Sequence, residues 1–139
     1  MNRILGIVLL LLSLTPAVGI GGVQLADQEI IKAVEHAHLQ LDRWATRLMY
    51  RIERGAGPRQ SDPLLDGRAH LMVTKMRANY AAAAGSRKLA VAIHHLADAH
   101  EDRLRSLDAM LRRGVVRQPL RPDDESIASA FRELSALRD

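Results

Sequence analysis

The sequence predicts an all-α protein, an up-down-up bundle of three long helices with a short fourth helix, preceded by a hydrophobic export segment. Three observations lead to this fold class. Aromatic residues make up only 3% of the 139 residues, so the core must be aliphatic, whereas strands favour aromatic and β-branched residues. Apolar residues recur every three or four positions over long stretches, which is typical of amphipathic helices. Glycine and proline cluster between these stretches, where helices end.

The amino-terminal segment, residues 1–26, is expected to direct export. After Arg3 the chain carries no charge over residues 4–26, and residues 7–12 are all apolar. One interpretation is a signal peptide that is cleaved after Gly19, beyond small residues at the specificity positions. The other is a retained membrane anchor, because 23 uncharged residues at about 1.5 Å each can cross an apolar layer of about 30 Å.

Both interpretations place residues 27–139 outside the cytoplasm. Arg3 precedes the apolar run and Asp27 follows it, and positive charge stays on the cytoplasmic side. Only three of the 20 basic residues are lysine, a bias typical of G+C-rich bacterial genes. We therefore expect one helical domain that is periplasmic or anchored in the inner membrane. Because cysteine is absent, packing alone must stabilise it.

The first long helix is expected from residue 27 to residue 54. Asp27 is a suitable N-cap. Gly55 and Pro58 end the helix, because glycine adopts the left-handed C-cap conformation and proline cannot continue the hydrogen-bond ladder. The inward positions follow the helical period: Ile30, Val34, Leu41, Ala45, Leu48 and Ile52.

Two further long helices are expected on either side of Gly85. Ser61 and Pro63 combine a capping side chain with a proline at the first helical position, so the second helix should begin there. The third is expected over residues 87–113. A single helix over residues 63–113 is the alternative, but it would far exceed the usual length of globular helices. Short connections favour antiparallel neighbours and hence an up-down-up bundle.

The carboxyl-terminal part is expected to hold a linker and a short helix. Residues 114–122 contain two prolines and no periodicity, which is typical of a linker. Residues 123–139 show a narrow apolar stripe with helical spacing. We expect this helix to close the bundle; the alternative is that it stands free until a partner accepts its stripe.

Three histidines suggest a metal site in the bundle. His38, His70 and His100 each lie eleven to fourteen residues from the same end of the predicted bundle, so the three imidazoles could share one layer. The alternative is a core histidine at position 100, since only His100 projects squarely inward. Glu35 and His38 form a single Glu-x-x-His unit, whereas di-iron bundles need two. We therefore expect no cofactor, with a transition metal ion as the alternative.

The composition disfavours several function classes. The net charge is +4, but acidic and basic residues are interspersed and aromatic residues are few, so no basic patch with stacking side chains is available for nucleic acid. No serine has the glycine-flanked setting of a hydrolase nucleophile, and the acidic residues alternate with arginine at helical spacing, as on ion-paired surfaces. We therefore predict that the protein is not an enzyme.

The remaining class is an interaction protein of the bacterial envelope: an accessory subunit, an immunity or inhibitor protein, or an assembly factor that binds another envelope protein. Its predicted binding surface is the stripe of the last helix with the arginines before it, which also suit contact with the inner membrane. The predicted partner-binding residues are Arg117, Arg121, Ile127, Phe131 and Leu134. The alternative function is a periplasmic metal-binding or metal-sensing bundle. The sequence leaves the oligomeric state open.

Overall fold

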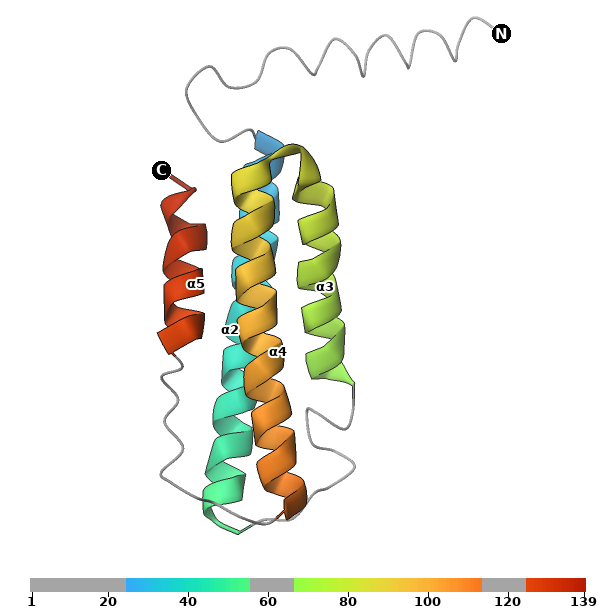
Figure 1. Ribbon diagram of the computed structural model, residues 1–139, viewed down its shortest axis with the longest axis vertical. Coiled ribbons are helices and arrows are strands. Elements are labelled where there is room, and N and C mark those ends of the chain that lie inside the picture. The colour runs from blue at the N-terminus through green and yellow to red at the C-terminus, as the bar shows by residue number, and fades with distance from the viewer. Residues whose placement is uncertain (1–24, 56–66, 114–124) are drawn as a thin grey trace, which may run out of the picture.

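The structure is a computed structural model that describes residues 25–55, 67–113 and 125–139. These residues form helices with no strand among them, which confirms the predicted all-α class and the helical bundle (Figure 1). The predicted linker and residues 1–24 of the predicted export segment lie outside the described residues, whereas the last two residues of that segment belong to α2. The helices are α2 (Leu25–Glu53), α3 (Arg68–Ala82), α4 (Arg87–Arg113) and α5 (Glu125–Ala136), with a 3-10 turn η1 (Ala83–Gly85) before α4.

Helix α2 follows the predicted pattern closely. It begins at Leu25, two residues before the predicted start, so the prediction of Asp27 as the N-cap is wrong; Asp27 lies in the first turn, where an acidic side chain is favourable to the helix dipole. Gly55 ends the helix as predicted, with φ of 72° and its N–H donated to the carbonyl of Ile52 at 2.9 Å. The buried face consists of aliphatic residues at three- and four-residue spacing: Ile31, Val34, Ala37, Leu41, Ala45, Leu48, Met49 and Ile52.

Helix α3 is shorter than the sequence suggested. It begins at Arg68, after Gly67 with φ of 78°, and not at Pro63, which lies outside the described residues. The predicted break between α3 and α4 is confirmed. The chain passes through η1 and then through Ser86, whose extended backbone interrupts the helical ladder before Arg87.

Helix α4 is the centre of the bundle and packs against α2, α3 and α5. Twelve of its 27 residues are buried, more than in any other described helix. The core is aliphatic throughout, and Trp44 and Phe131 pack against it only partly buried, in agreement with the low aromatic content. None of the described helices combines the length and apolar character needed to span a bilayer.

Helix α5 docks on the bundle through its apolar stripe. Ile127, Ala130 and Leu134 are buried, and α5 packs on α4. Figure 1 shows α5 and α3 on opposite sides of the α2–α4 pair. The docked alternative is therefore the one present here. Helices α5 and α3 each bury three residues, fewer than α2 and α4, and a helix with few buried apolar contacts opens more easily.

Candidate functional site

A polar network of four side chains crosses the otherwise aliphatic interior between α2 and α4. His38 and Asp42 lie one turn apart on α2, and His100 and Arg103 lie one turn apart on α4, so each pair shares a helix face. His38 Nδ1 and His100 Nε2 are 2.9 Å apart. The Arg103 guanidinium donates to Asp42 Oδ1 at 2.9 Å and lies 3.3 Å from His100 Nδ1. His100 is fully buried and Arg103 is 7% exposed.

The chemistry of the donors determines the direction of every hydrogen bond in this network. Arginine has only donors, so His100 Nδ1 must accept from Arg103. A neutral imidazole carries one N–H, which in His100 must then be at Nε2, and it donates to His38 Nδ1. His38 in turn carries its proton on Nε2. The order of donation therefore runs from Arg103 through His100 to His38.

Both histidines are held in the neutral form. Burial lowers the pKa of His100 to about 2, and the positive charge of Arg103 and the neighbouring His38 act in the same direction. Burial also lowers the pKa of His38, with Asp42 opposing and Arg103 reinforcing the shift. The Arg103 Nε atom is buried without a hydrogen-bond partner, so the network leaves one polar atom unsatisfied.

Helix α5 covers this network from one side. The ring of Phe131 stacks on the imidazole of His38, with centroids 4.1 Å apart and planes inclined by 15°. Arg138, just beyond α5, forms an ion pair with Glu35 of α2. Glu133 bonds with His95 Nδ1 of α4 at 3.0 Å. Polar contacts to both long helices therefore flank the aromatic contact.

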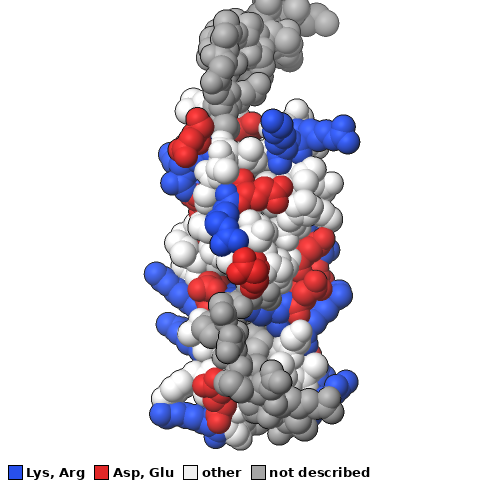
Figure 2. Space-filling view, turned by 60° about the vertical axis from the view of Figure 1, so that its left-hand side comes forward, with Lys and Arg blue, Asp and Glu red and all other residues white. Residues whose placement is uncertain are grey.

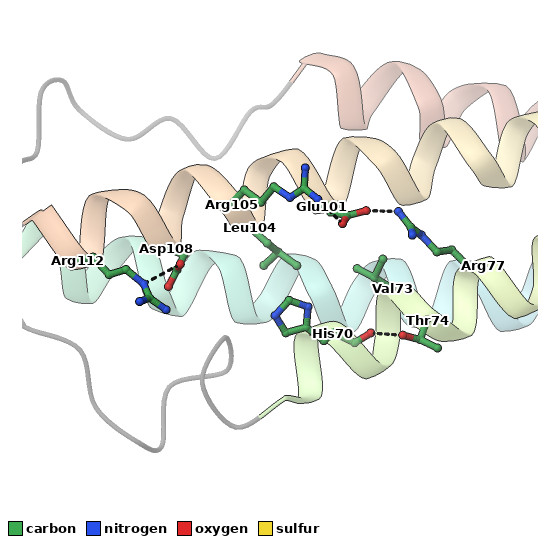
Figure 3. A pocket seen from close by; sticks show the side chains of 9 residues that line it. All are labelled: His70, Val73, Thr74, Arg77, Glu101, Leu104, Arg105, Asp108 and Arg112. Carbon is green, nitrogen blue, oxygen red and sulfur yellow. Dashed lines mark hydrogen bonds and ion pairs between the residues drawn. The ribbon is translucent and has the colours of Figure 1, made fainter.

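A second concave site lies between α3 and α4 (Figure 3). It has a volume of about 320 Å³. Glu101 binds both Arg77 and Arg105, and Asp108 binds Arg112 at 2.9 Å. Every arginine of the pocket is thus paired with a carboxylate, although Arg77 and Arg105 share Glu101. The lining residues are His70, Val73, Thr74, Arg77, Glu101, Leu104, Arg105, Asp108 and Arg112.

The three histidines predicted as metal ligands do not meet. His38 and His100 lie together in the interior, whereas His70 is exposed and lines the pocket between α3 and α4. Within the described ranges no group of three or more histidine, aspartate, glutamate or cysteine side chains is placed to hold a metal ion. His70 was predicted as a ligand because it lies at the same height along the bundle as His38 and His100. Height along a helix axis, however, does not determine the direction in which a side chain points.

Of the five residues predicted to bind a partner, the structure describes only the three that lie on α5. Arg117 and Arg121 lie outside the described residues. Ile127 and Leu134 are buried against the bundle, and Phe131 is partly buried on His38. A partner could reach this stripe only after α5 leaves the bundle, so binding through it stays a prediction.

The sequence analysis missed the solvent-facing side of α2. Leu39 and Tyr50 are 51% and 52% exposed, although both side chains are large and mostly apolar. Arg54 lies over the ring of Tyr50, with the guanidinium carbon 4.2 Å from the centroid. We call this surface the α2 outer face; its residues recur at steps of four, four, three and four and are Leu39, Arg43, Arg47, Tyr50 and Arg54. That spacing is present in the sequence, but apolar periodicity predicts only the inward positions of a helix.

Two arginines of the α2 outer face are without a partner in the part of the chain that the structure describes. Arg43 and Arg47 are exposed and make no ion pair or hydrogen bond there, and no acidic residue belongs to the row. On the face that Figure 2 shows, charges of both signs are mixed. Comparison with protein-family models, curated proteins and solved structures finds no match to this chain.

Proposed function

We propose that the chain is a non-enzymatic interaction protein of the bacterial envelope, which binds another protein through the α2 outer face. An accessory subunit, an immunity or inhibitor protein and an assembly factor are the roles that suit such a protein. The uncharged run over residues 4–26 supports the location, with residues 27–139 in the periplasm or anchored in the inner membrane as one up-down-up bundle. The observation that carries the proposed binding function is the exposure of Leu39 and Tyr50 beside Arg43 and Arg47, which have no partner within the described residues.

The composition of the α2 outer face suits a protein partner. Tyrosine and arginine are enriched in protein interfaces and among the residues that dominate binding energy, whereas lysine is depleted there. The row from Leu39 to Arg54 extends about 22 Å along the helix axis. A long and narrow surface of this kind matches one helix of a partner that carries acidic and apolar residues at the same spacing.

The two polar sites support an interaction protein rather than an enzyme. In the pocket between α3 and α4, Glu101 and Asp108 already bind the arginines. In the bundle interior, the imidazole of His100 is fully buried and bonded on both nitrogens. At both sites each arginine is thus paired with a carboxylate.

Site-specific photo-crosslinking tests the proposed surface. Tyr50 would be replaced by the photoreactive residue p-benzoylphenylalanine in the full chain, which would be expressed in the bacterium that naturally produces it. Tyr80 of α3, which is 40% exposed, provides the matched control position. We expect one discrete adduct with an envelope protein from position 50 and no such adduct from position 80.

Charge reversal then tests the role of the arginines. Combining Arg43→Glu with Arg47→Glu should remove the adduct from position 50, because two favourable charges become repulsive towards an acidic partner. The combination of Arg87→Glu with Lys88→Glu, at the exposed start of α4, is the control and should leave the adduct in place. The proposal fails if position 50 gives no adduct, if position 80 gives the same adduct, or if the adduct survives reversal at positions 43 and 47.

A further inference from the structure

The hydrogen-bonded chain formed by Arg103, His100 and His38 has no place for an additional proton. Its three members are joined by contacts of 3.3 Å and 2.9 Å, and the Nδ1 atoms of both histidines act as acceptors. A proton added at His38 Nδ1 would direct two N–H groups at each other across 2.9 Å. If His100 instead carries its proton on Nδ1, its Nε2 can accept a hydrogen bond from His38. The Nδ1–H of His100 then points at the Arg103 donor, 3.3 Å away. Every arrangement with one more proton therefore contains one contact between two donors.

The charged groups around the pair on α2 and α4 compensate only in part for a positive charge, because Asp42 raises the pKa of His38 while burial and Arg103 lower it. On α2, Asp42 already accepts a hydrogen bond from Arg103. Glu35, also on α2, is engaged by Arg138. On α4, Arg103 is itself positive and adds to the unfavourable potential at both histidines.

The remaining helices supply no further anion to the pair within the described residues. From α5, the group against His38 is the uncharged ring of Phe131, and Glu133 is bonded to His95. From α3, Arg77 binds Glu101 and Asp98 of α4 and not the histidine pair. An imidazolium at this site would need water to stabilise it.

His38 is partly exposed, and Phe131 keeps water from one face of its imidazole. Its ring lies nearly parallel to the imidazole at a centroid distance of 4.1 Å. Water can reach this face of His38 only if Phe131 moves away, and Phe131 belongs to α5, of which three residues are buried. Helix α4, in contrast, buries twelve residues and cannot move without opening the core.

We propose that His38 and His100 form a proton-sensitive latch, which holds α5 on the bundle while both imidazoles are neutral and releases α5 when the pair takes up a proton. This inference is independent of the α2 outer face. With α5 released, the stripe of Ile127, Phe131 and Leu134 and the surface that it covers both become open to other molecules. The latch would thus expose, in acid, a surface that is closed at neutral pH.

The direction of the pH dependence follows from proton binding. Histidine in water titrates near pH 6.5, and burial lowers the pKa of both members of the pair, with Phe131 of the docked α5 covering one face of His38. The released state therefore binds more protons below pH 6.5, so docking is strongest above that pH and weakens as the pH falls. Protonation of His95 would strengthen its bond with Glu133, so this contact opposes release and cannot cause it.

Distance measurements between two labels on the full chain test the latch. The chain lacks cysteine, so Ser106→Cys on α4 and Ser129→Cys on α5, both at exposed positions, give two unique sites for spin labels. At pH 7.5 we expect a single narrow distance distribution. Between pH 6.5 and pH 4.8 we expect a second population at longer distance, which grows as the pH falls and reverts when it is raised.

Two further variants show whether the histidine pair causes the change. In His38→Gln the amide oxygen can still accept from His100, but the side chain takes up no proton, so the short distance should persist at every pH. His95→Gln is the matched control on α4 and should keep the acid transition. The latch is refuted if the distance in the parent chain is the same at pH 7.5 and pH 4.8, or if His38→Gln undergoes the same transition.

A measurement on the unsubstituted chain does not depend on how the variants fold. Nitrogen chemical shifts of the imidazoles at neutral pH report which ring nitrogen carries the proton. We expect both histidines to carry it on Nε2, with Nδ1 unprotonated. A proton on His100 Nδ1 would reverse the order of donation and refute the latch.

Discussion

The ring of Phe131 lies flat on the imidazole of His38, with 4.1 Å between centroids and 15° between planes. One residue comes from the last helix of the chain and the other from the first described helix. Their contact joins the apolar stripe of α5 to the polar network of the interior. The packing of α5 and the protonation of the histidine pair are therefore coupled.

Substitution of Phe131 should loosen α5 without unfolding the bundle. Phe131→Ala removes the ring from His38, and since the ring is partly buried we expect a loss of about 1–3 kcal/mol in the free energy of unfolding. Hydrogen exchange measured by mass spectrometry should show lost protection in α5 and retained protection in α4. The exposed neighbour Arg132→Ala serves as the control. Equal loss of protection in α4 and α5 would show that Phe131 supports the whole core.

The stability of the folded chain should decrease in acid because of His100. Its pKa is lowered from 6.5 to about 2, so the unfolded chain binds the additional proton first as the pH falls. Stability is complete above pH 6.5 and is lost progressively below it, by about 1–2 kcal/mol between pH 7.5 and pH 5. Urea denaturation at several pH values measures this slope.

Two histidine variants separate this effect from general acid sensitivity. His100→Gln should flatten the dependence of unfolding free energy on pH between pH 7.5 and pH 5. His36→Gln, on the exposed side of α2, should leave the dependence as it is. A slope that is the same in all three proteins would place its origin in other titrating groups.

Deletion of residues 125–139 should leave a folded core and an intact α2 outer face. The deletion removes the three buried residues of α5, whereas α2, α3 and α4 keep their mutual contacts. Far-UV circular dichroism should show most of the helicity retained, and crosslinking from position 50 should persist. If the chain stays helical but the adduct is lost, the partner binds the stripe of Ile127, Phe131 and Leu134 as predicted from the sequence.

Added metal ions should not stabilise the protein through a three-histidine site. His70 lies on the pocket between α3 and α4, away from the His38–His100 pair, and Arg103 places a positive charge beside that pair. The melting temperature measured with and without zinc, nickel or copper ions should be unchanged. A metal-dependent rise that disappears in His70→Ala would contradict this arrangement and restore the metal-binding alternative.

The positions of the helices could be predicted where local backbone chemistry determines them. Gly55 ends α2 with a positive φ, and the break near Gly85 separates α3 from α4, both as expected from residues whose preferences are local. The start of α3 was expected at Pro63, but the helix begins at Arg68 after Gly67. Gly67, the residue directly before the helix, is a second glycine with positive φ and determines this start.

The candidate site could be predicted only in part. The inward direction of His100 follows from the apolar period of its helix, and the structure buries it completely. Its partners Arg103 and Asp42 were not expected, because Arg103 reads as a member of an exposed charged face and yet is 7% exposed. Its burial depends on the bond to Asp42, which is 61 residues away in the chain.

By itself the sequence determined the helical class, the aliphatic core and the ends of several helices, because these follow from interactions between residues close together in the chain. Only the tertiary structure decided that His38 meets His100 and Phe131 while His70 does not. Spacing along a helix gives the height of a side chain, whereas the rotation of each helix about its axis depends on the packing of all its neighbours at once. The polar network and its contact with α5 depend on these rotations and therefore on the packing of all the helices together.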